Sequence, residues 1–172
     1  AEEEVMEAGT AAHRIIQEEL ARAGMLVKKE AEVYDPYADI SGTVDAVVRQ
    51  GRENTVMEFK TVSSEKLARL SAPQSQHRSQ INFYLKQLRL RRGSIVYISR
   101  DDPTLTKSFP VTFNYGLYQR NVQELQEARG AANDILSRGL GNPGEAYSHL
   151  DRLMVLVNVA PYSDEFEKEL GV

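Results

Sequence analysis

Two runs of alternating apolar and polar residues, separated by turn-forming residues at 51–54, constrain the fold of this chain most strongly. Side chains along a strand point to opposite faces in turn, so both runs predict β-strands joined in a meander. The second run, residues 55–61, is expected to place Glu58 and Lys60 on one face. The first run, residues 39–50, is expected to gather its apolar residues on one face: Ile40, Gly42, Val44, Ala46 and Val48.

Four helices are predicted, mainly from apolar residues that recur three or four positions apart. The first covers residues 2–23 and ends at Gly24. A short second helix is capped by Ser63 or Ser64 and ends near residue 70. A longer third helix runs from Pro73 to about residue 92, where Gly93 closes it. The last helix is expected at residues 116–138.

Three further strands are expected at residues 26–34, 95–99 and 105–113, and the nearly continuous apolar run at 95–99 is typical of a central strand. The order helix, three strands, helices, two strands, helix predicts an α/β fold with a mixed sheet flanked by helices. We expect residues 1–172 to form a single domain. A glycine-rich loop at residues 139–144 leads to a tail with an apolar run at 153–159.

The composition excludes several classes of protein. The chain has no cysteine, so disulfides, thiolate zinc sites and an iron–sulfur cluster are not expected. No stretch approaches the roughly 20 apolar residues of a membrane span, and the acidic start lacks the basic and apolar regions of a signal peptide. We therefore expect a soluble, cytoplasmic protein with no membrane partner.

Charge is distributed unevenly along the chain. The net charge is −4, yet residues 60–92 contain eight Lys or Arg and a single acid, Glu65. A basic segment inside an acidic protein indicates an anionic partner for that segment. The alternative interpretation is a solvated basic helix face without a partner.

Asp45, Glu58 and Lys60 carry the strongest indication of chemistry. Both carboxylates lie in largely apolar strands, and a tight turn between the strands brings them side by side. Adjacent carboxylates repel unless a positive charge lies between them, and Mg²⁺ is commonly held by one or two carboxylates. Such an ion activates water and polarises a phosphoryl oxygen, while Lys60 can stabilise the developing charge. By themselves the three residues support only a metal-dependent hydrolase.

Four motifs in order narrow this interpretation: Gly9-Thr10-Ala11-Ala12-His13, Gly42-Thr43-Val44-Asp45, Glu58-Phe59-Lys60 and Gln80-Ile81-Asn82-Phe83-Tyr84. Each is common singly. Together they resemble the PD-(D/E)XK nuclease superfamily, in particular the RecB-like branch that includes CRISPR-associated adaptation nucleases and many phage exonucleases. The resemblance spans residues 9–84 and implies a restriction-endonuclease-like core.

The resemblance also implies roles for individual residues. His13, Asp45, Glu58 and the main-chain carbonyl of Phe59 would bind Mg²⁺ or Mn²⁺, and Lys60 would be the catalytic lysine. Gln80 and Tyr84 would line the site, although Tyr84 also fits a purely structural role in the core, as His13 fits a buried helix face. The expected phosphate contacts are Lys66, Arg69, His77, Arg78 and Lys86.

Two features depart from the family or remain open. Iron–sulfur members of the branch carry a C-terminal cysteine cluster, which this chain lacks. Relatives often place an additional acid in the first strand, where this chain has Glu30 and Glu32. Both residues also fit ordinary solvent-facing positions on an edge strand, which is the interpretation we favour.

The expected function is a Mg²⁺- or Mn²⁺-dependent DNA nuclease, an exonuclease acting on single strands or ends, of prokaryotic or phage origin. A homo-oligomer or a larger DNA-processing complex is left open. Two alternatives remain: a non-cleaving nucleic-acid-binding module of a recombination or replication complex, and a hydrolase of another phosphate ester. The basic segment favours a polymer as substrate over a small molecule.

Overall fold

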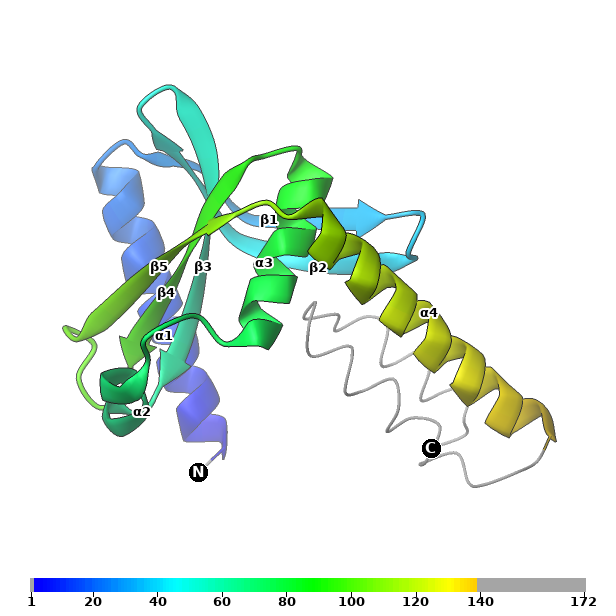
Figure 1. Ribbon diagram of the computed structural model, residues 1–172. Helices are drawn as coiled ribbons and strands as arrows, with labels where there is room; N and C mark the ends of the chain where they lie inside the picture. Colours follow the sequence, from blue (N-terminus) through cyan, green and yellow to red (C-terminus); the bar gives the residue numbers. More distant parts are fainter. Residues whose placement is uncertain (1, 139–172) are drawn as a thin grey trace.

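The computed structural model describes residues 2–138, which form a five-stranded sheet with helices on both faces (Figure 1). The elements in chain order are α1 (Glu2–Arg22), β1 (Leu26–Asp35), β2 (Ile40–Gln50), β3 (Glu53–Val62), α2 (Ser64–Arg69), α3 (Ser75–Leu88), β4 (Arg92–Ser99), β5 (Thr106–Thr112) and α4 (Tyr115–Arg138). The strands lie in the order β1-β2-β3-β4-β5. Only β3 and β4 pair in parallel, so the sheet is mixed. The predicted α/β fold with a mixed sheet flanked by helices is confirmed.

Each face of the sheet carries its own apolar cluster. On one face, α3 and the first half of α4 pack against side chains such as Val44, Val56 and Ile95. On the other face, α1 packs against a smaller cluster that includes Val48 and Phe59. We call these the α3 face and the α1 face. The parallel β3–β4 pair requires a crossover connection, and α2 and α3 provide it.

Strands β2 and β3 separate partway along their length. Their pairing runs only from Gln50 opposite Glu53 to Ala46 opposite Met57. Beyond that point residues 40–44 of β2 pair with β1, whereas residues 58–62 of β3 pair with β4. We call this divergence the β2–β3 fork.

The prediction that the apolar residues of β2 share one face is wrong. Val44 belongs to the cluster on the α3 face, whereas Ala46 and Val48 belong to the cluster on the α1 face. The strand therefore switches faces at Asp45. The residue opposite Asp45 on β1 is Glu30, which has a left-handed backbone with φ of 49°. The β1–β2 pairing nevertheless keeps its register through this level, from Lys29 opposite Ala46 to Ala31 opposite Val44.

The prediction that Gly93 closes the long helix is also wrong. That helix, α3, ends at Leu88, and Arg89 caps it in the left-handed region with φ of 56°. Gly93 lies inside β4, paired with Val56. A Cβ there would lie 2.8 Å from Ile81 Cδ1 and 2.9 Å from the Val56 carbonyl oxygen. The glycine allows α3 to pack closely on the sheet rather than ending the helix.

The remaining boundaries agree with the sequence patterns to within a few residues. α1 ends at Arg22, and Gly24 follows with φ of 69°. The β2–β3 turn is tighter than expected because β3 already begins at Glu53. The predicted loop at 139–144 and the apolar run at 153–159 lie outside the described residues. Within residues 2–138, no helix has the length and apolar character needed to cross a membrane.

Substitution of Gly93 by alanine should lower the free energy of unfolding by about 1–3 kcal/mol, because the added methyl group meets backbone as well as a side chain. Urea denaturation measures the change. Gly130→Ala in α4 is the matched control, since nothing lies within 4 Å of the new methyl group. That control should be neutral or stabilising by roughly 0.5–1 kcal/mol. Equal stability of the two variants would contradict the close approach of α3 to β4.

Candidate functional site

Asp45 and Glu58 exchange hydrogen bonds across the mouth of the fork. The backbone N–H of Asp45 donates to Glu58 Oε1 at 2.9 Å, and the backbone N–H of Phe59 donates to Asp45 Oδ2 at 2.9 Å. Backbone N–H groups beyond the end of the β2–β3 ladder are thus bound by carboxylate oxygens. The exchange fixes the two carboxylates side by side where the strands part.

The carbonyl of Asp45 is held by the α1 helix. It accepts a hydrogen bond of 2.9 Å from Gln17 Nε2, and Gln17 is only 8% exposed. Both peptide groups of Asp45 therefore bond to side chains. Gly9 is two turns before Gln17, and a Cβ there would lie 3.3 Å from Thr61 Oγ1. Gly9 and Gln17 together bring α1 close to the fork.

His13 lies between these two positions on the same helix face. Its Nδ1 is 3.8 Å from Asp45 Oδ1, and its ring meets the Phe59 ring edge-on with centroids 5.5 Å apart. Residues four apart stack along one face of a helix. The spacing of Gly9, His13 and Gln17 therefore places the imidazole over the fork from the α1 face.

Glu58 is a buried acid with an altered affinity for protons. It is 2% exposed, and burial, followed by the neighbouring Asp45 carboxylate, raises its pKa well above the ordinary value. The positive charge of Lys60 acts in the opposite direction. A hydrogen bond between the Glu58 and Asp45 side chains adds to the increase. The negative charge of Asp45 therefore disfavours ionisation of the neighbouring Glu58 carboxyl group.

Lys60 follows Glu58 by two residues on β3, so both side chains leave the strand on the α3 face. The positive charge of the ammonium lowers the pKa of both Glu58 and His77. Among the described residues, no ion pair involves Lys60. Its charge is therefore not neutralised by a contacting carboxylate within this part of the chain.

Gln80 and Tyr84 face the carboxylates from α3. Tyr84 is fully buried, and burial followed by the Glu58 carboxylate raises the pKa of its hydroxyl. The backbone of Thr43 also bonds this hydroxyl. Gln80 Nε2 donates to Tyr84 Oη at 3.3 Å, whereas Gln80 Oε1 is buried without a hydrogen-bond partner among the described residues. A buried acceptor of this kind needs a donor, which a bound water can supply.

His77 is neutral at neutral pH. Its Nδ1 is 2.8 Å from Tyr97 Oη. Because Tyr97 Oη accepts the backbone N–H of Gln74, the hydroxyl hydrogen of Tyr97 can be donated to the imidazole. Burial, then Lys60 and Lys66, lower the pKa of His77 to about 4. His77 can therefore offer a hydrogen bond to a phosphate, but not a positive charge.

The other expected phosphate contacts lie in different places. Lys66 and Arg78 are exposed near the start of α2 and α3. Arg69, also on α2, pairs with Glu65 at 2.6 Å in an exposed contact of little energetic value. Lys86 lies in the last turn of α3, where its amine is 5.3 Å from the centroid of the Tyr118 ring. Two turns of helix, about 12 Å, separate it from Arg78.

Glu30 and Glu32 are both exposed on the edge strand β1, in agreement with the interpretation of solvent-facing residues. Glu30 lies opposite Asp45 in the β1–β2 pairing and has a left-handed backbone. Neither acid contributes a side chain to the buried centre of the fork.

The donors at the fork suit a hard divalent cation. Within residues 2–138, no three His, Cys, Asp or Glu side chains are already arranged as metal ligands. The N–H of Phe59 points into the fork, so its carbonyl, on the same side of the strand, does so too.

Gln17 and Tyr97 contact residues of the candidate site but were not predicted from the sequence to do so. Gln17 follows His13 by four residues, so the helical spacing itself could have suggested it. Tyr97 comes from the apolar run at 95–99, where nothing distinguishes it from a core residue. Its contact with His77 appears only once β4 and α3 pack together.

No protein-family model matches the chain, and no curated protein matches it. A solved structure described as "Crystal structure of SSO0001" is similar to this chain with a TM-score of 0.47 and 22% identity. The similarity covers 61% of this chain and 50% of that chain, so this chain spans about half the length of the matched structure.

Replacement of Gln17 by leucine should lower the free energy of unfolding by about 1–3 kcal/mol, because the Asp45 carbonyl loses its buried donor. Urea denaturation again measures the change. Glu18→Leu, at an exposed neighbouring position, should stay within about 0.5 kcal/mol of the parent protein. If both variants were equally stable, the hydrogen bond from α1 would not hold β2 in place.

Proposed function

We propose that the β2–β3 fork is the active site of a divalent-metal-dependent DNA nuclease. We further propose that the chain belongs to the RecB-like branch of the PD-(D/E)XK superfamily, which its motifs resemble. The main observation in support is the Asp45–Glu58 pair, in which Glu58 is 2% exposed and the Asp45 side chain is 20% exposed, with Lys60 and His13 beside it. Burial of one carboxylate next to a second is costly for stability, so the pair needs a reason beyond folding.

The proposed ligands are the side chains of His13, Asp45 and Glu58 and the carbonyl of Phe59, with Mg²⁺ or Mn²⁺ as the ion. An oxygen-rich site suits Mg²⁺, and an imidazole ligand makes Mn²⁺ acceptable too. The ion, when bound, supplies a Lewis acid that polarises the scissile phosphate and favours hydroxide over water. The chain itself holds both carboxylates in place through the backbone N–H groups of Asp45 and Phe59.

Lys60 and Gln80 are proposed to act on the reacting groups. Lys60, which has no ion-pair partner within residues 2–138, can orient the attacking water and stabilise the extra negative charge on the phosphate. Gln80 Oε1, which accepts no hydrogen bond from the described part of the chain, offers an acceptor for a water proton. Tyr84 positions Gln80 through the hydrogen bond between them and fills the space beside Glu58.

The proposed substrate is DNA, and the preference for single strands or ends rests on the family resemblance alone. Lys66 and Arg78 are exposed where α2 and α3 begin, and both belong to the basic segment 60–92. A polyanion bound there should dissociate as salt increases, because phosphate contacts release counterions. Such a dependence would favour a polymer over a small phosphate ester.

Glu58→Gln and Lys60→Met should each reduce cleavage of end-labelled DNA in Mn²⁺ or Mg²⁺ by about 100-fold or more. The first variant removes a proposed ligand, and the second removes the charge that stabilises the transition state. Glu53→Gln is the matched control, since it is an exposed acid on the same strand and should cut normally. Single-stranded and duplex substrates, with EDTA as a blank, report strand preference and metal dependence together.

Undiminished metal-dependent cleavage by Glu58→Gln would reject the proposed site. DNA binding by the parent protein without cleavage under any metal condition would instead favour the non-cleaving module. Circular dichroism of each variant separates loss of chemistry from loss of fold.

A further inference from the structure

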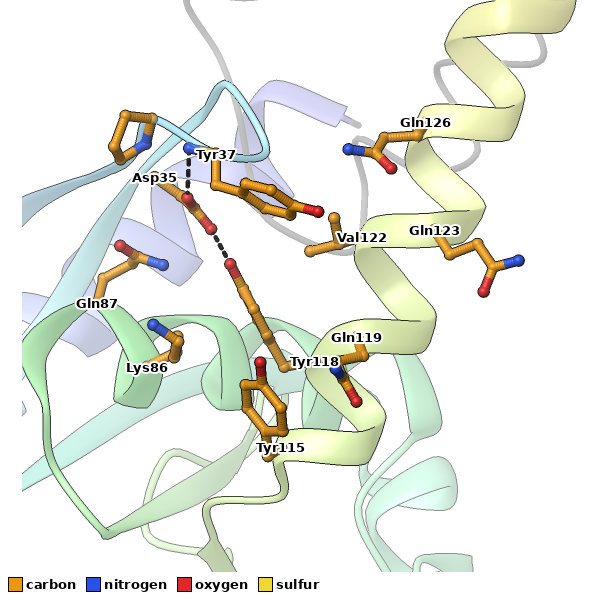
Figure 2. A pocket seen from close by; sticks show the side chains of 11 residues that line it. Asp35, Tyr37, Lys86, Gln87, Tyr115, Tyr118, Gln119, Val122, Gln123 and Gln126 are labelled. Atoms are coloured by element: carbon orange, nitrogen blue, oxygen red, sulfur yellow. Dashed lines mark hydrogen bonds between the residues drawn. The ribbon is translucent and has the colours of Figure 1, made fainter.

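A cavity of about 630 Å³ lies away from the fork, between the β1–β2 turn, the last turns of α3 and the first half of α4 (Figure 2). Its size is within the range of pockets that hold small organic ligands. The proposed nuclease chemistry uses none of its side chains except Lys86, which the sequence analysis assigned to phosphate. Its walls are aromatic and amide-bearing rather than aliphatic.

The wall of the cavity is held in place by a buried acid. Asp35 is 3% exposed, and its Oδ1 accepts the backbone N–H groups of Tyr37 at 2.9 Å and Ala38 at 3.2 Å. Its Oδ2 accepts a hydrogen bond from the Tyr118 hydroxyl. Arg129 of α4 donates to the carbonyls of Ala38 and Asp39. The β1–β2 turn and α4 are therefore tied together, and the cavity between them is preformed.

Two tyrosine rings are left exposed at this preformed cavity. Tyr37 is 74% exposed on the β1–β2 turn, and Tyr115 is 56% exposed at the start of α4. Tyr115 stacks on Tyr118, with ring centroids 6.1 Å apart and planes inclined by 29°. Figure 2 shows Tyr37 entering from one element and Tyr115 and Tyr118 from another. Exposed rings on two walls of a cavity offer flat surfaces for a planar ligand.

Polar groups of a particular kind complete the lining. Gln87, Gln119 and Gln126 each bring a carboxamide, which has both donors and acceptors. Lys86 adds a positive charge beside the Tyr118 ring. Among the described lining residues, the only acid is Asp35, whose two oxygens already accept hydrogen bonds. The cavity can therefore accept a planar polar group joined to an anion.

From these groups we infer that the cavity binds an unpaired nucleobase of a single-stranded nucleic acid. The tyrosine rings provide stacking surfaces, the carboxamides contact the polar edge of the base, and Lys86 meets the adjoining phosphate. The inference rests on the proposed function and adds to it a contact that selects single strands, because a paired base cannot enter the cavity. The inference places Lys86 at a second phosphate contact, separate from the one proposed for Lys66 and Arg78.

The position of the cavity suits a strand that also reaches the fork. Helix α3 joins the two sites, since Gln80 and Tyr84 face the fork while Lys86 and Gln87 line the cavity. Six residues from Gln80 to Lys86 correspond to about 9 Å of helix. A stacked strand advances about 3.4 Å along its axis per nucleotide, so a few nucleotides span the distance.

The test measures binding of a single-stranded oligonucleotide that contains 2-aminopurine to the full chain in EDTA, where cleavage cannot occur. Stacking on tyrosine should quench the fluorescence of the probe when it binds. Tyr37→Ala and Tyr115→Ala should each weaken binding by roughly tenfold, as expected for loss of a stacked ring. Tyr34→Ala is the matched control, since Tyr34 is also 56% exposed but does not line the cavity.

Affinities of Tyr37→Ala and Tyr115→Ala equal to that of Tyr34→Ala would overturn the inference, as would tighter binding of duplex than of single strand. Two competitors are added to the bound probe: a tyrosine-rich peptide and an unlabelled oligonucleotide. If only the peptide abolished the tyrosine-dependent quenching, the cavity would belong to a protein partner and the inference would be overturned. Glu53→Gln, an exposed position outside both proposed sites, should bind the probe normally in the same assay. Tyrosine-dependent binding by a protein that does not cut would leave this inference in place while rejecting the nuclease.

Discussion

The structure around the site depends on two hydrogen bonds between β2 and β3. The backbone N–H of Asp45 donates to the Glu58 carboxylate, and the backbone N–H of Phe59 donates to the Asp45 carboxylate. Each carboxylate takes a backbone N–H from the neighbouring strand, at the point where β2 and β3 stop pairing. The strands can separate there without leaving these donors unsatisfied. The arrangement has a cost, because the buried Glu58 lies beside a second acid and its pKa is raised. In the proposed function, a divalent cation bound between the carboxylates would offset that cost.

The fork also explains why residues from both helical layers meet at one place. His13 and Gln17 approach from the α1 face, whereas Lys60, Gln80 and Tyr84 approach from the α3 face. A continuous sheet would keep these two groups apart. The face switch of β2 at Asp45 belongs to the same arrangement, since the peptide groups of Asp45 bond to side chains of β3 and α1.

Local patterns predicted the strands, the helices and the face of β3 that carries Glu58 and Lys60, because these follow from alternation and periodicity. The face switch of β2 could not be predicted, since it arises from contacts made after α1 and β3 are in place. Gly93 was misassigned because a glycine that permits close packing looks like one that ends a helix. The roles proposed for Lys60 and the metal ligands remain predictions drawn from the motifs and supported by the geometry of the fork.

Titration of the protein with Mn²⁺, followed by calorimetry without nucleic acid, tests most directly whether the fork is a cation site. The parent protein and Glu53→Gln should bind one ion with the same affinity, whereas Glu58→Gln should bind it at least about tenfold more weakly. Equal affinities for all three proteins would contradict the account, because the ion would then bind somewhere other than between Asp45 and Glu58. Absence of Mn²⁺ binding by the parent protein would contradict it as well.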